Sequence, residues 1–332
     1  MRDATSDGKI ARLRESEERI HDPASIDAKL SSLTTDQRST LWKLYRGSRR
    51  ALTRGEMASR AKLVGLFRDT ATEIEADIFS AFNRLPGETW DYGLVRRIGR
   101  DKELLDQVND RIGALGYKVE GSLSDDLIDQ FKQTWIDGAY RLDALTPASA
   151  NIRFGLLPDR EIIALLDTPW SGARFSQRLG LINNDMAARI KSQILRSMMA
   201  EESWSDTARR IRDEMGAKGQ RSVWRAEMVA RTELAHAQTT ANMMVYADNA
   251  DVIEKIIWIA HPGACPKCLA KHGKSVLVVG YPPEDSHPNC VCDILAVTKP
   301  FDKIAKPGDP AFKAPPSRAS WVEDKTVAGM LQ

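Results

Sequence analysis

The stretch WIAHPGACPKCLAKHGKSVLVVGYPPEDSHPNCVCDILAV, which runs from Trp258 to Val297, contains all four cysteines of this 332-residue chain. Two of them form a Cys-Pro-Lys-Cys segment at 265–268, and the other two belong to a His-Pro-Asn-Cys-Val-Cys group at 287–292. Close pairs of sulfur and imidazole ligands joined by a loop have the spacing of a structural zinc site, which takes four such ligands in a tetrahedron. We therefore expect this stretch to bind one structural zinc ion.

Three of the four expected ligands are cysteines. Cys265 and Cys268 direct two sulfurs to one point because a Cys-x-x-Cys segment forms a turn, and Cys290 opens the second pair. The fourth ligand is His287 or Cys292. The proline after His287 favours an extended backbone, and Cys290 and Cys292 project to the same side of an extended segment. The sequence does not decide between the two candidates.

Other interpretations of the cysteines are less consistent with their clustering. Scattered cysteines would favour buried thiols or two disulfides, but here all four fall within 28 residues. A redox Cys-x-x-Cys normally lies in a βαβ unit, which this stretch does not resemble. A catalytic zinc would need an open coordination position and a general base, and the sequence offers no candidate for the base.

The composition is that of an ordinary soluble protein. The formal charge is +2, from 48 basic and 46 acidic residues, which is no general signature of nucleic-acid binding. No apolar run approaches the roughly 18 residues of a membrane span, and the polar first 20 residues do not resemble a signal peptide. We expect no membrane association and a reducing, cytoplasmic origin, which favours thiolates on zinc over disulfides.

Proline positions predict the architecture. Only five of the fifteen prolines precede residue 260, and long stretches without proline permit long helices. We therefore expect a mainly α fold: a helical body, a small C-terminal zinc-stabilised β module and an extended tail. The predicted segments are an N-terminal helical region at 1–150, a helical body at 151–250, the zinc-binding β module at 251–298 and a Pro-rich tail at 299–332. Three short strands are expected in the module, at 256–259, 276–279 and 291–297.

Two helices are expected over residues 35–85, ending at Leu85-Pro86-Gly87. The second carries an apolar stripe with spacings of three, four and seven residues. Residues 43–62 contain seven basic side chains and one acidic one. They form either a surface for DNA or an acidic partner, or a solvated basic face. The apolar stripe consists of Leu63, Leu66, Phe67, Ile74, Ile78, Phe82 and Leu85.

Capping patterns predict the starts of further helices. The Ser122-Leu-Ser-Asp125 segment resembles a capping box and predicts a helix start within residues 89–146, before a buried face that includes Leu127, Ile128, Phe131, Trp135 and Leu142. Thr168-Pro169 is a second predicted start, with threonine as the N-cap and proline at the first position. Ser203 is the predicted cap of a helix at 204–215.

An Ala-rich helix is expected from about Arg221 to Asp248, and it carries three charged residues of interest. Arg231 and Glu233 are two positions apart and face different directions, whereas Arg231 and Glu227, four apart, can pair. No glycine-rich phosphate loop accompanies them. We interpret these residues as a structural network of ion pairs that anchors the zinc module to the helical body.

A series of motifs follows in order along the segment Arg225–Val297. They are Arg231-Thr232-Glu233, Tyr246, Trp258, Cys265-Pro266-Lys267-Cys268, Gly273, Pro282-Pro283 and His287 to Cys292. With these motifs the segment resembles the C-terminal domain of the Mu F-like phage head morphogenesis proteins, which are minor capsid proteins of tailed phages. Two positions depart from the family pattern: Val291 replaces a frequent arginine, and His261 replaces a frequent acidic residue. Neither change removes a candidate ligand.

The resemblance implies a minor head protein that acts in head morphogenesis near the portal vertex. The implied partners are the portal protein, the major capsid or scaffolding protein and packaged DNA. The implied location is the virion head, and the host cytoplasm during assembly. The alternative function is a DNA-binding zinc protein of genome packaging or ejection. An enzyme is not expected, because the sequence contains no His-Glu-x-x-His, Gly-x-Ser-x-Gly or Walker motif.

Overall fold

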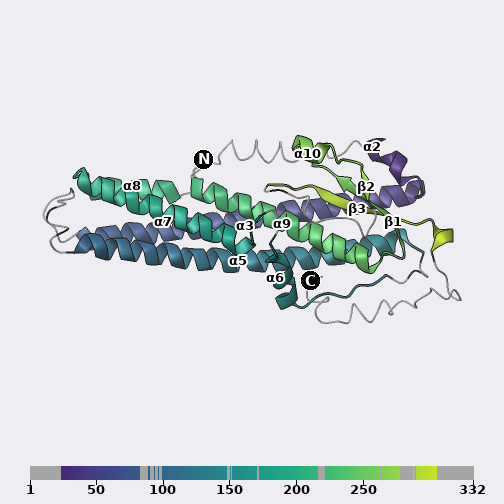
Figure 1. Cartoon of the computed structure of the whole chain (residues 1–332), viewed down its shortest axis with the longest axis horizontal. Coiled ribbons are helices and arrows are strands. Elements are labelled where there is room, and N and C mark those ends of the chain that lie inside the picture. Colours follow the sequence, from purple (N-terminus) through teal and green to yellow (C-terminus); the bar gives the residue numbers. More distant parts are fainter. Residues whose placement is uncertain are drawn as a thin grey trace. The chain divides into compact units, whose positions relative to one another are not determined.

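The structure is a computed structural model that describes residues 24–82, 89, 93, 96, 99–147, 150, 152–169, 172–215, 221–261, 263–276, 287 and 289–304. As predicted, the chain is mainly helical with a small sheet near its C-terminus (Figure 1). The elements are α2 (Ala24–Asp27), η1 (Ala28–Leu30), α3 (Thr35–Phe82), α5 (Arg100–Leu145), α6 (Asp159–Leu166), α7 (Phe175–Met199), α8 (Trp204–Met215), α9 (Arg221–Asp248), β1 (Ile253–Ile259), α10 (Pro266–Leu269), β2 (Ser275–Val276), β3 (Asp293–Thr298) and η4 (Phe301–Lys303).

The prediction of two helices over residues 35–85 is wrong, because α3 runs unbroken from Thr35 to Phe82. Two of its three interior glycines, Gly47 and Gly65, have open space at the Cβ position. Each costs about 1 kcal/mol relative to alanine and does not end a helix. A capping box begins the helix: the Thr34 N–H donates to Gln37 Oε1 at 2.9 Å, and the Gln37 N–H donates to Thr34 Oγ1 at 3.3 Å.

The helix start predicted at Ser122–Asp125 is also wrong, because these residues lie inside α5. Buried leucine and valine side chains continue on one face through the segment, at Leu115, Val119, Leu123 and Leu127. Burial of this face stabilises α5 as one continuous helix. This contribution is larger than that of a cap at Ser122, which would require the helix to be interrupted there.

The predicted apolar faces of α3 and α5 are largely confirmed. Leu66 and Ile128 are half-buried, and Leu85 lies outside the described residues, as does the predicted helix end at 85–87. The buried members are Leu63, Phe67, Ile74, Ile78, Phe82, Leu127, Phe131, Trp135 and Leu142.

The start predicted at Thr168-Pro169 is wrong, since α6 ends at Leu166 and α7 begins at Phe175. Arg174 is the N-cap of α7, and its N–H donates to Gln177 Oε1 at 2.9 Å. The residue after α6 also holds this helix start: Asp167 Oδ1 accepts hydrogen bonds from the N–H and the hydroxyl of Ser176, at 3.2 and 3.0 Å. The predicted cap of α8 is confirmed, because the Asp206 N–H donates to Ser203 Oγ at 3.4 Å. The predicted bounds of α9 are confirmed as well.

The described residues form two compact units. The first unit takes residues 24–53, 129–159 and 235–304, and the second takes Arg54–Ile128 and Arg160–Leu234. Each unit therefore combines separate stretches of the chain, whereas the segments predicted from the sequence follow one another along the chain. Residues 305–332, most of the predicted tail, lie outside the described residues.

The first unit contains the sheet, whose strand order is β2-β1-β3 with both pairs antiparallel. In the register, Ile256 lies opposite Val276 on one side and Ala296 on the other. The sheet shares a hydrophobic core with residues 26–33 and with parts of α3 and α5. The core residues are Ile26, Leu30, Leu33, Leu41, Trp42, Tyr45, Leu145, Ile257, Ile259, Leu295 and Val297.

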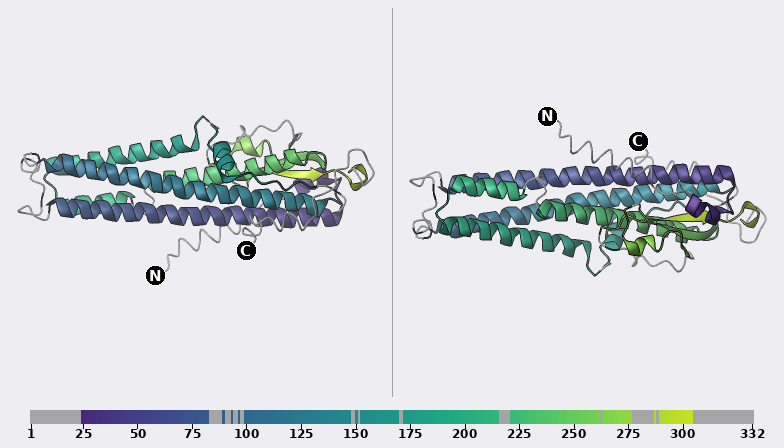
Figure 2. Two further views of the ribbon diagram at one scale, coloured as in Figure 1. Left: turned by 90° about the horizontal axis from the view of Figure 1, so that it is seen from below. Right: turned by 90° about the horizontal axis from the view of Figure 1, so that it is seen from above.

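The second unit is helical, and α7 and α8 lie alongside its portions of α3 and α5 (Figure 2). The ring of Trp204 packs edge-on against Phe79, with centroids 4.7 Å apart. Close to Trp204 in sequence, Arg212 donates two hydrogen bonds to the Glu75 carboxylate at 3.1 and 3.2 Å. Within the described ranges, no helix combines the length and the apolar character needed to cross a membrane.

Candidate metal centre

The Cys-x-x-Cys segment lies in the connection between β1 and β2. Cys265 has an extended backbone and directly precedes α10, whose first residue is Pro266. The Leu269 N–H donates to the Cys265 carbonyl at 2.9 Å, so the two cysteines lie on one turn. Gly273 then adopts a positive φ of 71°, which glycine tolerates best, and its N–H donates to the Trp258 carbonyl at 2.9 Å. This turn returns the chain to β2.

The second ligand group directly precedes β3 and is folded by a tight turn. The Cys290 N–H donates to the His287 carbonyl at 2.9 Å. Asn289 within the turn has a positive φ of 64°, a conformation that asparagine adopts more readily than most residues. The turn therefore brings His287 and Cys290 close together.

The five predicted ligand side chains meet in one cluster. His287 Nε2 lies 3.2 Å from Cys265 Sγ and 3.2 Å from Cys268 Sγ. Cys268 Sγ lies 3.8 Å from Cys290 Sγ. Around one tetrahedral zinc ion, two sulfurs would lie about 3.8 Å apart, and a sulfur and a nitrogen about 3.5 Å apart. The observed spacing is therefore close to that of ligands around a metal ion.

Two overlapping ligand sets can hold a metal ion. One is Cys265, Cys268 and His287, and the other is Cys268, Cys290 and Cys292; within each set the ligand atoms lie within 4.8 Å of one another. All four cysteines are free thiols, so the disulfide interpretation does not hold. Cys268, Cys290 and Cys292 are buried, and this burial protects the cluster from solvent.

The protonation of the thiols favours metal binding at Cys290. A hydrogen bond from the Cys292 thiol lowers the pKa of Cys290 to about 5, and the same bond raises the pKa of Cys292. Burial raises the pKa of Cys268 to about 12. A hydrogen bond from the Cys268 backbone N–H lowers the pKa of Cys265. Since the thiolate is the metal-binding form, Cys290 is prepared as a ligand, whereas Cys268 must lose a proton on binding.

The two other histidines of this stretch hold backbone turns. The Ala260 N–H donates to His272 Nδ1 at 3.2 Å, and the Gly263 N–H donates to His261 Nδ1 at 3.1 Å. The His261 N–H donates to Cys292 Sγ at 3.4 Å. These contacts order the loop around the cluster without making either ring a member of the two ligand sets.

The predicted network on α9 has other partners than expected. Glu233 is 2% exposed and accepts a hydrogen bond from Arg178 of α7. Arg231 lies 3.9 Å from Glu56, and Glu227 pairs with Arg60 at 2.9 Å. The structure thus pairs these residues across helices of the second unit rather than along α9, because long side chains reach the facing helix. These pairs lie within the second unit, whereas the ligand cluster belongs to the first unit.

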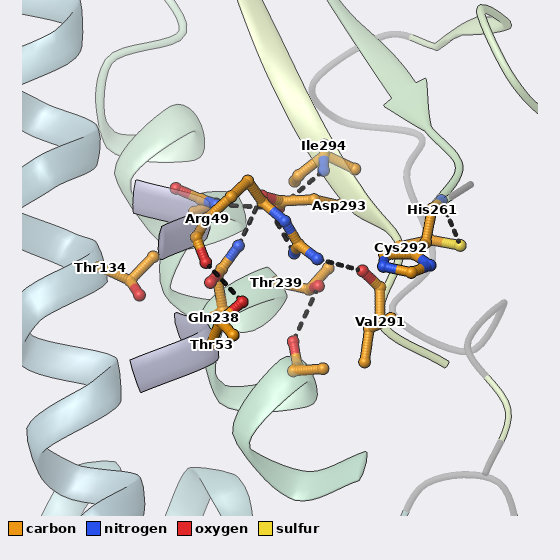
Figure 3. A network of polar contacts seen from close by, with 12 residues as sticks. Arg49, Thr53, Thr134, Gln238, Thr239, His261, Val291, Cys292, Asp293 and Ile294 are labelled. Atoms are coloured by element: carbon orange, nitrogen blue, oxygen red, sulfur yellow. Dashed lines mark hydrogen bonds and ion pairs between the residues drawn. The ribbon is translucent and has the colours of Figure 1, made fainter. Parts of the chain in front are cut away.

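A set of polar residues that the sequence did not indicate lies beside the Val291–Asp293 segment, which adjoins the ligand cluster (Figure 3). Arg49 of α3 donates from Nη2 to the Val291 carbonyl at 2.9 Å. Asp293 accepts hydrogen bonds from Gln238 at 2.5 Å and from Asn242 at 3.1 Å. Helical phase was the available signal for Arg49, which falls on the buried face of α3 with Leu41, Tyr45 and Leu52.

Tyr246, one of the residues that carries the family resemblance, is fully buried in the same unit. Its hydroxyl accepts a hydrogen bond from Arg141 Nη1 at 3.2 Å, and burial raises its pKa. Arg141 also lies over the ring of Tyr45, 6.0 Å from its centroid. The tyrosine hydroxyl thus supplies a hydrogen-bond acceptor for a buried guanidinium.

Comparison with known proteins adds no assignment: no family model, no curated protein and no solved structure matches this chain. The ligand cluster and the polar residues around it are the features of the described chain that bear most directly on function.

Proposed function

We propose that this chain is a minor head protein of a tailed phage, of the Mu F-like type, whose C-terminal module is held by one structural zinc ion. The observation that carries the proposal is the Cys/His cluster, which joins the β1–β2 connection to the segment before β3. The order of motif residues over 225–297 supports the family.

The proposed ligands are Cys265, Cys268, Cys290 and His287. His287 is favoured as the fourth ligand because its Nε2 lies 3.2 Å from both sulfurs of the Cys-x-x-Cys turn. Three thiolates and one imidazole are a preferred donor set of structural zinc. One ion is proposed rather than two, because both ligand sets use Cys268 and five ligands cannot complete two tetrahedra.

A structural role fits the size of the module. Among the described residues the sheet has three strands, and β2 contains two residues. Such a sheet is too small to be stable alone, so a metal that joins its connections contributes directly to folding. A site with four protein ligands leaves no position for a substrate, and we therefore propose assembly rather than catalysis. The proposed partners are the portal protein and the major capsid or scaffolding protein.

Contact with DNA is a second candidate function, favoured by one face of α3. Lys43, Arg46 and Arg50 are exposed, and their spacing of three and four residues places them on the same side of the helix. None of them forms an ion pair with an acidic side chain in the described part of the chain. Unpaired cations in a row can neutralise successive phosphates of a nucleic acid.

The head-protein proposal is tested by co-purification of the full chain with the portal protein of the same phage, and by mass spectrometry of purified heads. We expect the chain to co-elute with the portal protein and to be present in heads. Absence from heads assembled in its presence would contradict the proposal.

The DNA candidate is tested by measuring duplex affinity against salt concentration for the wild type and for Lys43→Glu/Arg46→Glu/Arg50→Glu. A nucleic-acid face predicts that the triple variant binds more weakly and with a smaller salt slope. Lys118→Glu, at an exposed position of α5, is the control. Equal loss in the triple variant and the control would exclude a specific role of this face.

A further inference from the structure

Arg49 is a charged side chain in the interior of the first unit. It is 8% exposed, and its partner Asp293 is 1% exposed. Burial of a charge is costly unless the group is paired and hydrogen-bonded. Arg49 Nη1 lies 3.9 Å from Asp293 Oδ2, and Nη2 donates to the Val291 carbonyl at 2.9 Å. The two nitrogens of one guanidinium thus contact two residues of the same short segment.

Asp293 is itself held by three donors from two elements. Gln238 and Asn242 of α9 donate to its two carboxylate oxygens at 2.5 and 3.1 Å. The Ile294 N–H donates to Oδ1 at 2.8 Å. A Cβ atom at Gly138 of α5 would lie 3.2 Å from Asn242 Oδ1, so the small residue there leaves room for the amide. The carboxylate therefore has a defined position, and Arg49 is placed against it.

The position of Val291 connects the contacts of Arg49 and Asp293 with the candidate metal ligands. Val291 is the single residue between Cys290 and Cys292, and its carbonyl is the acceptor of Arg49 (Figure 3). A hydrogen bond to this carbonyl orients the peptide group between Val291 and Cys292 and so restrains the backbone beside Cys290. Asp293 follows Cys292 directly and begins β3. The segment that supplies the proposed ligand Cys290 is thus fixed on α3 through Arg49 and on α9 through Asp293.

We propose that Arg49 and Asp293 are positioning residues of the metal centre, which hold the Cys290–Cys292 segment in its ligating conformation before the metal binds. This inference rests on the proposed zinc site. Residues that orient metal ligands without touching the metal typically contribute about 10–100-fold to metal affinity. They act by reducing the ordering that binding would otherwise require.

The test compares Zn²⁺ and Co²⁺ affinities of full-length variants by competition with a chromophoric chelator. Arg49→Met keeps most of the length of the side chain and removes its donors, and Asp293→Asn is isosteric and removes the charge. The matched controls are Arg46→Met and Arg50→Met, at exposed positions of the same helix. We expect a loss of about 10-fold or more in both test variants and less than about twofold in the controls.

Two further readouts separate positioning from a merely structural role. The absorption bands of bound Co²⁺ report ligand number and geometry, and they should shift or broaden in folded Arg49→Met. In the wild type, the Ile294 N–H should be protected from hydrogen exchange in the metal-free protein as well as in the zinc-bound protein. Rapid exchange of this amide in the metal-free wild type would contradict preorganisation. This measurement needs no variant, so it remains decisive if Arg49→Met or Asp293→Asn fails to fold.

The outcomes distinguish this inference from the proposal on which it rests. A wild-type protein that binds neither Zn²⁺ nor Co²⁺ would overturn the metal centre itself. The positioning role alone would be overturned if the wild type binds metal and the folded Arg49→Met and Asp293→Asn proteins bind it with unchanged affinity and an unchanged Co²⁺ spectrum.

Discussion

Arg49 Nη2 donates a hydrogen bond to the carbonyl oxygen of Val291, which lies 2.9 Å away and 242 residues later in the chain. This bond connects α3 with the segment between two candidate metal ligands. The hydrophobic core of the same unit likewise contains residues of α3 and of the sheet, among them Tyr45 and Ile257. The sheet and the Cys/His cluster beside it, here called the metal module (residues 253–298), therefore belong to the core of the first unit. Stabilisation by a bound metal should extend to the helical segments of this unit.

Removal of the metal should lower the thermal stability of the protein. Zinc that binds only the folded state stabilises it by about 4 kcal/mol at a free concentration of 1,000 times the dissociation constant. We expect Tm to rise steadily with buffered free zinc, measured by circular dichroism at the helical signal. The Cys265→Ser protein is the control and should show no such rise. A wild-type Tm that is independent of zinc would contradict a folding role for the metal.

Loss of one partner of the Arg178–Glu233 pair should destabilise the second unit. Arg178→Met leaves the Glu233 carboxylate, which is 2% exposed, without its cation. Removing one member of a buried pair typically costs about 3–5 kcal/mol. Chemical denaturation measures this loss. Arg68→Met is the control, because the Arg68 and Asp69 side chains are both 69% exposed and the change should cost less than about 0.5 kcal/mol. Equal effects of both substitutions would argue against a buried ion pair.

Gly116→Ala should destabilise the packing of α5 against α7. A Cβ atom at this position would lie 2.2 Å from Asn183 Nδ2 and 3.0 Å from its Cγ, so the amide must move. We expect a cost of about 1–3 kcal/mol. Gly113→Ala in the same helix meets open space and should instead stabilise by about 0.5–1 kcal/mol. In an Asn183→Ala background the cost at Gly116 should vanish, and persistence of that cost would show that the contact is not its cause.

The stability of the metal module should fall when His272 becomes protonated. Burial lowers the pKa of His272 below its ordinary value, and Nδ1 must be unprotonated to accept the Ala260 N–H. The unfolded chain therefore binds the proton more readily. The stabilising contribution is complete above about pH 6.5 and is lost as the pH falls below that value.

The measurement for His272 is thermal unfolding of zinc-saturated protein across this pH range. His272→Gln, whose amide oxygen can still accept a hydrogen bond, should show a weaker pH dependence than the wild type. Identical profiles for the two proteins would assign the acid sensitivity to other groups.

Local patterns in the sequence were sufficient for the metal cluster and for several helices. Each of the two ligand groups is a short segment that contains its own turn residues. The spacing of the ligands in the sequence therefore predicted that Cys265, Cys268, His287, Cys290 and Cys292 would meet. The cap at Ser203 predicted the start of α8 for the same reason. The turns within each ligand group and the cap at Ser203 depend on contacts within a few residues.

The sequence was less informative where distant contacts decide the outcome. A capping pattern at Ser122 was overruled because the buried side chains around it continue α5. Glu233 pairs with Arg178, 55 residues earlier in the chain, rather than with its own helix. Arg49 was counted among seven basic residues as part of a surface, although it is buried against β3. Each of these outcomes depends on which face another helix or strand covers.

The zinc content per chain, in protein purified under reducing conditions without chelators, decides whether a metal ion holds the Cys/His cluster. We expect about one zinc ion per wild-type chain. Cys265→Ser, Cys290→Ser and His287→Ala should lose the metal, whereas Cys292→Ala should retain it. Loss of zinc in Cys292→Ala together with retention of zinc in His287→Ala would show that Cys292, and not His287, is the fourth ligand. A wild-type protein without zinc would contradict the claim that a metal ion holds this module together.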